Sequence, residues 1–469
     1  MKKNIFVLAS ILIAATLFLS SCAPAAAPAA EEPAAEQPAA EEPAAEPAAA
    51  SEPVKIGVYS VAWSPSSINM MKQLIEKFNA EHDGQIIAEY IQGDWGEGDT
   101  YISAGVAGGG GIADAIEWYT GGALDWYNQG YALDLSPYVT DEVRATLPEI
   151  LWNARTAEDG AVYESCTVQG EHIVIYYNPA LLEEAGITPP ELGDTWTWNE
   201  FLENAKKLTV DANGIRNGEE GFDPDNVVQW GFVPRLDNEK LWEEISNYAL
   251  QATQKPMIRK DDDGMWDIFF DEEAMPAIET YLSLLEEKIT PEEAIGLGGD
   301  SQDELFYQGT AAMVQRAYFN AAVLHDNYPD FEFGVMPIPM EPGSKYYQSP
   351  SNSQGFSVPV TSEHPAEAAE FVFWMQKAEN QALWTSALML APCNPAAMED
   401  PLIKDDPEFG GLLFYKSIEE LVDAEYNTNQ DEFVTTVYGP TMMDVLMGNL
   451  TLEDGISSIK AVSKDVLNQ

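Results

Sequence analysis

The chain has 469 residues, of which 78 are acidic and 23 are Lys or Arg, so its formal net charge is −55. Nucleic acids and anionic lipid surfaces are bound by clustered Lys and Arg. This charge therefore argues against a nucleic-acid partner and against electrostatic docking on a membrane. A solvated acidic surface explains the charge better than a site for cationic ligands does.

Residues 1–21 have the features of a signal peptide. Two lysines precede an apolar run from Ile5 to Leu19, which is too short to cross a hydrocarbon core of about 30 Å comfortably. Two serines and then Cys22 follow, which is typical of a lipobox, where the cysteine becomes lipidated. Two acyl chains on Cys22 would anchor the protein stably at the outer face of the bacterial cytoplasmic membrane. The alternative is an ordinary secretory signal with a chance cysteine.

Residues 22–53, after the cleavage site, consist of Pro, Ala and Glu repeats with almost no large apolar side chain. Such a segment cannot form a core. Prolines favour extended polyproline II at about 3.1 Å per residue, which gives a reach of roughly 90 Å. We interpret the segment as a tether between the lipid and a folded body.

The folded body, residues 54–469, contains no second long apolar segment and is long enough for two or three domains of about 150 residues. Apolar residues alternate from Val54 to Val58 and predict a strand. A helical spacing from Ile68 to Phe78 and a second strand, Ile86 to Ile91, follow. The body therefore opens with a βαβ unit, which favours a parallel sheet.

Three later segments carry local signals. The glycines of 108–111 precede no Lys-Ser/Thr pair, so they indicate a flexible connection and not a phosphate loop. Residues 261–264, Asp-Asp-Asp-Gly, predict a hairpin turn in preference to a calcium loop. Pro365 suits the first turn of a helix, and its apolar stripe runs from Ala368 to Met375.

The search for catalytic or metal-binding chemistry is mostly negative. The four histidines are far apart and no G-x-S-x-G elbow occurs. Asp211 to Gly214 resemble the start of an EF-hand loop, but Ile215 occupies a ligand position, so we expect no metal and no cofactor. The 78 acidic residues would allow a carboxylate pair for glycoside hydrolysis, yet no pattern singles one out.

Cys166 and Cys393 remain once Cys22 is lipidated. An exported pair can oxidise, and geometry decides whether a bridge can close. From the residues alone, a disulfide and two buried free thiols both stay open.

The segment from Ile173 to Leu182, continuing through Ala185-Gly186-Ile187 to Trp196–Phe201, resembles the signature of family 1 extracellular solute-binding proteins. Four further segments fit that family in the same order, and together they span nearly all of the body. They are 130–135, 306–313, 333–339 and 364–371.

The resemblance implies an α/β fold of the periplasmic-binding-protein type II, with two lobes joined by three chain crossings and the ligand in the cleft between them. The expected crossings are near 163–170, 331–339 and 390–395. The expected lobes are an N-lobe of 54–165 plus 338–391 and a C-lobe of 166–337 plus 392–469.

The resemblance also implies that Cys166 and Cys393 lie at two crossings that such folds bring together, so it favours a disulfide between them. The chain departs from the family at Cys166, where a proline is usual. It departs again at Ala113-Asp114, where the family commonly has Pro-Asp.

The resemblance also implies a ligand site at strand ends and loops that face the cleft. Aromatic rings there would stack on the C–H faces of a sugar, and carboxylates, amides and Arg would pair with its hydroxyls. Each candidate also suits a role in the core or on the surface. The expected ligand-binding residues are Trp63, Ser64, Trp118, Tyr119 and Thr120 and, across the cleft, Glu171, Trp242, Arg316, Tyr318, Phe319, Ser351, Asn352 and Tyr438.

The implied function is that of a receptor, not an enzyme. A monomer binds a sugar or oligosaccharide by lobe closure and presents the closed shape to the permease of an ABC importer. The alternatives are a peptide or polyamine ligand in the same fold and, in a different class, a surface-anchored enzyme that processes glycosides. Tyr176-Tyr177 invites comparison with iron-binding relatives, but Tyr177-Asn178 is a common structural pair of the family.

Overall fold

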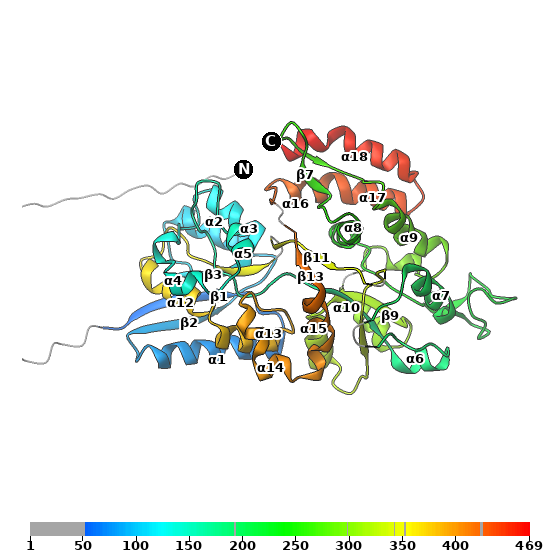
Figure 1. Ribbon diagram of the computed structural model, residues 1–469, viewed down its shortest axis with the longest axis horizontal. Helices are drawn as coiled ribbons and strands as arrows, with labels where there is room; N and C mark the ends of the chain where they lie inside the picture. Colours follow the sequence, from blue (N-terminus) through cyan, green and yellow to red (C-terminus); the bar gives the residue numbers. More distant parts are fainter. Residues whose placement is uncertain (1–51, 192–193, 298, 342, 351–352, 423–424) are drawn as a thin grey trace, which may run out of the picture. The chain divides into compact units, whose positions relative to one another are not determined.

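The computed structural model describes residues 52–469 apart from 192–193, 298, 342, 351–352 and 423–424 (Figure 1). The chain divides into two compact units, Met1–Ala50 and Ser51–Gln469. The expected signal peptide, Cys22 and nearly all of the expected tether lie outside the described residues. Within the described part, no helix has the length and apolar character that a membrane span requires.

The first lobe is built on a four-stranded sheet of order β12-β3-β1-β2. Strand β1 runs parallel to both β2 and β3, and β12 is antiparallel to β3. The predicted βαβ opening is confirmed, because α1 connects β1 to β2. The strands are β1 (Val54–Ser60), β2 (Ile86–Gln92), β3 (Ala115–Tyr119) and β12 (Gln354–Ser357).

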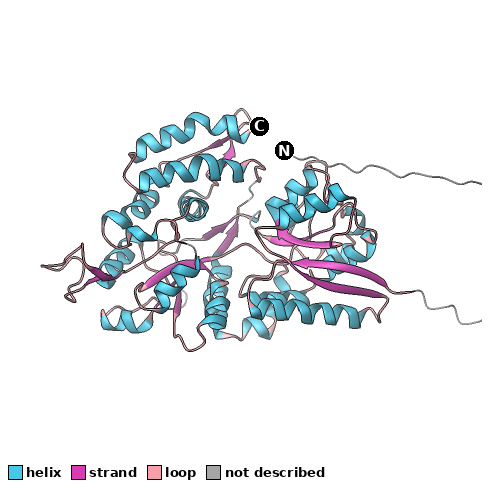
Figure 2. Ribbon diagram, turned by 180° about the vertical axis from the view of Figure 1, so that it is seen from behind, coloured by secondary structure: helices cyan, strands magenta, loops and turns pink. Residues whose placement is uncertain are grey.

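Helices flank this sheet (Figure 2). Helix α1 begins with a capping box between Ser64 and Ser67 and buries an apolar face that includes Met71 and Phe78. Gly109 ends α2 in the left-handed conformation, φ 79°, so the glycine run is a helix terminus and a connection. The helices are α1 (Pro65–Glu81), α2 (Gly98–Gly108), α3 (Thr120–Asn128), α4 (Asp141–Arg144), α5 (Glu149–Asn153), α12 (Pro365–Trp374) and α13 (Ala378–Leu388).

The second lobe has a three-stranded antiparallel sheet of order β10-β4-β9, with β4 buried at its centre. Its strands are β4 (Ile173–Tyr177), β9 (Met313–Ala317) and β10 (Gly334–Pro337). Its helices are α6 (Pro179–Glu184), α7 (Trp198–Leu208), α8 (Asn238–Thr253), α9 (Met275–Glu286), α10 (Gly299–Tyr307), α11 (Asn320–Asn327), α14 (Pro401–Lys404), α15 (Gly410–Ile418), α16 (Gln430–Phe433), α17 (Gly439–Leu446) and α18 (Leu452–Leu467).

Two motifs of the sequence act as helix starts in this lobe. Asn178 accepts hydrogen bonds from the backbone N–H groups of Ala180 and Leu181, and Pro179 follows it in the first turn of α6. Thr197 and Glu200 form a capping box that begins α7. These residues fix the entry of each helix beside β4.

Short strand pairs complete the lobe: β5 (Val210–Asp211) with β6 (Val227–Gln229), β7 (Ile258–Lys260) with β8 (Trp266–Ile268), and β11 (Tyr346–Gln348) with β13 (Glu419–Leu421). The β7–β8 hairpin confirms the turn predicted at 261–264. The Asp211 carboxylate accepts from the backbone N–H groups of Asn213, Ile215 and Asp223, so it closes its own loop.

The three chain crossings meet side by side, because Val168 forms β-bridges with both Gln354 and Pro392. The second crossing was expected near 331–339, and that prediction is wrong. Strand β10 pairs with β4, and Ile338, Met340 and Tyr346 pack in the core of the second lobe. The chain therefore reaches the first lobe only at β12. Cys166 and Val168, expected in the C-lobe, instead pack in the core of the first lobe.

Cys166 and Cys393 form a disulfide bond, with their Cα atoms 5.8 Å apart. Both residues are buried. The bond joins the first crossing to the third at the edge of the first lobe's core.

Candidate ligand-binding site

A cavity of about 730 Å³, called here the cleft cavity, lies between the two lobes. Its volume falls within the range of about 300–1,000 Å³ that is usual for small-molecule sites. Trp63, Trp95 and Tyr119 line it from the first lobe. The second lobe contributes side chains from α8, from the first crossing and from the segment around α16.

Helix α8 forms one wall of the cleft cavity. Asp237 caps this helix by accepting a hydrogen bond from the Lys240 backbone N–H at 2.9 Å. Lys240, Glu243 and Asn247 are three or four residues apart, so they share one helical face, and all line the cavity. The Lys240 ammonium donates to Glu243 at 2.5 Å, and Arg235 lies 3.2 Å from the other oxygen of that carboxylate. The charge of Glu243 is therefore compensated.

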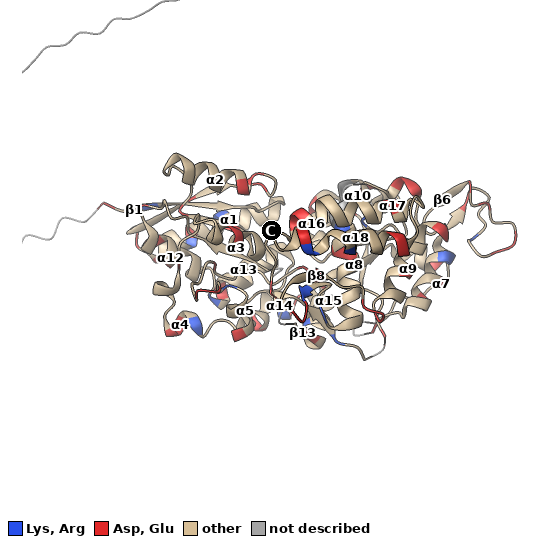
Figure 3. Ribbon diagram, turned by 90° about the horizontal axis from the view of Figure 1, so that it is seen from above, with Lys and Arg blue, Asp and Glu red and all other residues tan. Residues whose placement is uncertain are grey.

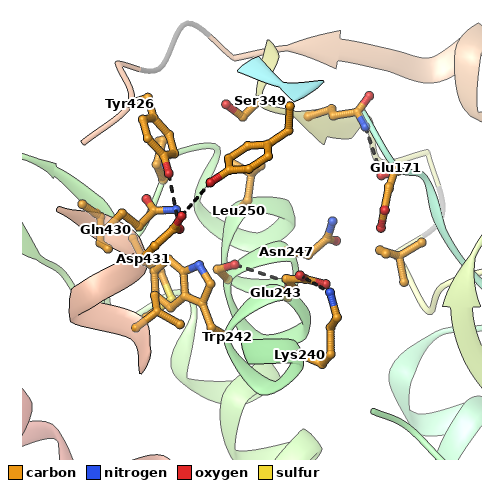
Figure 4. A pocket seen from close by; sticks show the side chains of 18 of the residues that line it. Glu171, Lys240, Trp242, Glu243, Asn247, Leu250, Ser349, Tyr426, Gln430 and Asp431 are labelled. Carbon is orange, nitrogen blue, oxygen red and sulfur yellow. Dashed lines mark hydrogen bonds and ion pairs between the residues drawn. The ribbon is translucent and has the colours of Figure 1, made fainter. Parts of the chain in front are cut away.

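Glu171, on the first crossing, faces this wall. Figure 4 shows Glu171 and the α8 side chains Glu243 and Asn247 on one side of the cavity, with Tyr426, Gln430 and Asp431 on the other. Burial raises the pKa of Glu171 and the nearby Glu243 adds to the rise, while Lys240 opposes it. Glu171 can thus accept a hydrogen bond from a ligand hydroxyl or, when protonated, donate one.

Asp431, on α16, accepts hydrogen bonds from both lobes. The Tyr119 hydroxyl of the first lobe donates to it at 2.8 Å, and the Tyr426 hydroxyl donates to its other oxygen at 3.3 Å. Burial, together with the charges of Asp431 and Asp99, raises the pKa of Asp125 to about 7. Asp125 of the first lobe and Asp431 of the second are therefore close enough to interact where the lobes meet.

Two further contacts connect the lobes beside the cavity. The Ser66 hydroxyl donates to Asp326 at 2.8 Å, and the rings of Trp63 and Phe319 meet edge to face with centroids 5.3 Å apart. Together with the bond between Tyr119 and Asp431, these contacts hold the rims of the cavity together.

Aromatic rings and polar groups alternate around the cleft cavity. Rings of this kind present apolar faces, and neighbouring carboxylates and amides present hydrogen-bonding atoms. These two kinds of group complement the C–H faces and the hydroxyl groups of a pyranose ring. The aromatic lining residues are Trp63, Trp95, Tyr119, Trp242, Phe319, Tyr347 and Tyr426.

The structure brings five of the expected ligand-binding residues to the cleft cavity: Trp63, Tyr119, Glu171, Trp242 and Phe319. The expected residues Ser351 and Asn352 lie outside the described residues. The other six do not line the cavity.

Three of these six belong to the first lobe. Ser64 is the N-cap of α1. Trp118 is buried on β3 and stacks on Trp126 with ring centroids 5.3 Å apart, and Tyr119 packs against it with ring centroids 5.8 Å apart. Thr120 is buried, and its hydroxyl donates to Glu164 at 2.8 Å.

The other three belong to the second lobe. Arg316 pairs with Asp303 at 2.9 Å, and the Tyr318 hydroxyl donates to the Glu408 carbonyl oxygen. Tyr438 is buried behind Trp242, with ring centroids 4.9 Å apart. It supports the cavity wall without forming its surface.

Sequence reasoning missed several lining residues. Trp95 lies shortly after the end of β2, as Trp63 lies shortly after β1, so the rule that selected Trp63 could have found it. The polar face of α8 also carried a signal, because Asp237 caps a helix with polar residues at helical spacing. The remaining missed residues include Asn247, Tyr347, Gln348, Tyr426, Gln430 and Asp431.

No group of three or more potential metal ligands occurs among the His, Cys, Asp and Glu residues that the structure describes. The charged residues, red and blue on the ribbon in Figure 3, are spread over the helices and loops of both lobes. The polar groups of the cleft cavity suit an organic ligand rich in hydroxyl groups.

Residues 64–382 match the model of the bacterial extracellular solute-binding protein family. The chain belongs to this family. An uncharacterized lipoprotein from the oleD 5′ region of Streptomyces antibioticus is 26% identical to this solute-binding protein over 360 residues, which cover 76% of this chain and 74% of that protein.

Solved structures share the fold of this solute-binding protein. The ABC substrate-binding protein Lmo0181 of Listeria monocytogenes, in complex with cycloalternan, has a TM-score of 0.70 at 17% identity and covers 89% of this chain and 99% of its own. Maltose-bound MalE3 of T. maritima has a TM-score of 0.68 at 19% identity, covering 88% and 99%. The predicted two-lobe α/β fold is confirmed.

Proposed function

We propose that this protein is the extracytoplasmic receptor of an ABC importer and that it binds a sugar or oligosaccharide in the cleft cavity. The observation that carries the proposal is the composition of that cavity, in which aromatic rings such as Trp63 and Trp242 alternate with acceptors such as Glu171 and Asp431. The family is one of solute-binding proteins, and the ligands of the solved neighbours named above, cycloalternan and maltose, are carbohydrates.

Binding would be transmitted by the arrangement of the lobes. Ligand atoms that contact both walls favour the closed arrangement, and the permease then distinguishes the closed from the open shape. No bond is made or broken in this step. A lipid on Cys22 and the acidic tether would keep the receptor close to the permease.

A thermal-shift screen of the purified protein tests the proposed ligand class. We expect a saccharide to raise the unfolding midpoint, because a ligand at a hundred times its dissociation constant stabilises the folded state by about 2.7 kcal/mol. The panel should contain mono- and oligosaccharides, amino acids, peptides and polyamines.

Two results would contradict the proposal. A midpoint raised by polyamines or peptides and by no saccharide would assign another ligand to the same fold. Turnover of a chromogenic glycoside that is lost in Glu243→Gln or Glu171→Gln would make the protein an enzyme.

A further inference from the structure

A second cavity of about 620 Å³, called here the first-lobe cavity, lies at the carboxyl ends of β1 and β2. Every residue that lines it belongs to the first lobe, and they include Tyr59, Trp63, Ile68, Trp95, Glu97 and Tyr101. Its volume is also in the range of small-molecule sites.

The two cavities adjoin, because Trp63 and Trp95 line both of them. Trp95 is 37% exposed, which is unusual for so large an apolar side chain. An occupant of the cleft cavity that extended past these two indoles would reach the first-lobe cavity.

Its aromatic lining is held rigidly. Tyr59 and Tyr101 stack with ring centroids 4.4 Å apart. Their hydroxyl groups are tied to the backbone, since Tyr59 accepts from the Asp94 N–H at 3.0 Å and Tyr101 accepts from the Ala113 N–H at 2.9 Å. The hydroxyls are thereby engaged by the protein. Tyr59 is buried and supports the partly exposed ring of Tyr101, which offers a fixed apolar surface.

The rim of this cavity is polar and exposed. Gln92, Asp94 and Glu97 are all exposed there. The Glu97 carboxylate makes no hydrogen bond or ion pair with another side chain in the described part of the chain, so it is available to accept from hydroxyl groups. The supported Tyr101 ring and the two indoles, beside the Glu97 carboxylate, repeat the chemistry of the cleft cavity.

We propose that the first-lobe cavity is an extension site for further sugar units of the ligand whose other end lies in the cleft cavity. The ligand is then an oligosaccharide long enough to pass Trp63 and Trp95. This inference rests on the proposed function, and it adds that affinity increases with chain length.

The test measures dissociation constants by isothermal titration calorimetry for linear gluco- and manno-oligosaccharides, from disaccharides to heptasaccharides. One of the two series should bind to the wild-type protein. Within that series, we expect the longer oligosaccharides to bind at least about 10-fold more tightly than the disaccharide. In Ile68→Trp, where the indole fills the first-lobe cavity, we expect this ratio to fall to about 1 while the disaccharide binds as before.

A second variant guards against misfolding, because Ile68 is partly buried. Glu97→Ala changes an exposed side chain and should weaken the binding of the longer ligands several-fold without affecting the binding of the disaccharide. The matched control is Val360→Trp, which adds an indole at an exposed position, 44% exposed, that lines neither cavity and should keep the wild-type ratio.

Equal affinity for short and long ligands in the wild-type protein would overturn the extension site, and so would an unchanged ratio in both variants. The proposed function fails differently, because then no saccharide of any length binds.

Discussion

At the scale of single residues, the indole of Trp242 shows how a side chain that lines the cleft cavity is held in place by packing behind it. It lines the cavity and rests edge-on against buried Tyr438, whose ring centroid is 4.9 Å away. Because its backing is rigid, this ring is presented to the ligand with little conformational entropy left to lose.

Replacing Trp242 by alanine tests this role. We expect Trp242→Ala to weaken saccharide binding about 10- to 100-fold, as truncation of a buried aromatic anchor usually does. The control is Trp230→Ala, which removes a partly buried tryptophan that does not line the cavity and should reduce only stability. Calorimetric titration and thermal melts measure the two effects. Equal affinity of Trp242→Ala and wild type would remove Trp242 from the site.

Single residues also show the limit of prediction from the sequence. Trp118, Tyr119 and Thr120 follow one another, and composition cannot tell which of them faces the cavity. The fold decides, because Trp118 packs on buried Trp126 in the core while the Tyr119 hydroxyl, at the end of β3, reaches Asp431 of the other lobe. The orientation of that strand is a property of the folded sheet, which the residue types alone do not specify.

At the scale of elements, helices and strands were predicted correctly where local motifs, such as helix starts and strand alternation, encode them. The opening βαβ unit, the hairpin at 261–264 and the helix at Pro365 all follow from local patterns. The second crossing was inferred near 331–339 from the family resemblance, and that resemblance does not specify which strands residues 334–348 pair with. Only the pairing of β10 with β4, and of β11 with β13, assigns these residues to the second lobe.

Strand β13 also carries a buried charge cluster at the crossings. The Glu419 carboxylate accepts from Gln169 at 2.7 Å and from Lys416 at 2.5 Å, and His172 lies 2.7 Å from its other oxygen. Burial alone would raise the pKa of Glu419, but its bonds to His172 and Lys416 outweigh burial and lower this pKa to about 2.

A pH dependence follows from that lowered pKa. The unfolded chain takes up the proton first, so the contribution of Glu419 to stability is complete above its ordinary pKa of 4.5 and is lost as the pH falls toward about 2. We expect the free energy of unfolding of Glu419→Gln to depend less steeply on pH in this window. Across the window, its change should be smaller than that of the wild-type protein by about 1–3 kcal/mol. Calorimetric melts between about pH 6 and 2.5 measure it. The exposed neighbour Glu420→Gln should retain the wild-type slope; a wild-type slope in Glu419→Gln as well would contradict the assignment.

At the scale of the whole molecule, the disulfide between Cys166 and Cys393 spans 227 residues of sequence. Closing so long a loop restricts the unfolded chain strongly, and the expected stabilisation is about 2–5 kcal/mol. The double variant Cys166→Ala/Cys393→Ala should therefore unfold at lower denaturant concentration than the wild-type protein. Dithiothreitol should lower the wild-type midpoint and leave the double variant unchanged. Equal midpoints for oxidised and reduced wild-type protein would show that the bond adds no stability.

The position of that bond also has a mechanical consequence. It fastens the first and third crossings together where both leave the core of the first lobe, and Val168 then touches Gln354 of the second crossing. A rotation of one lobe against the other must therefore bend the crossings beyond the bond, which in the first crossing means the few residues between Val168 and Ile173. The bond makes two of the three connections move as one unit, so a change of backbone angle beyond it shifts the rim where Tyr119 meets Asp431.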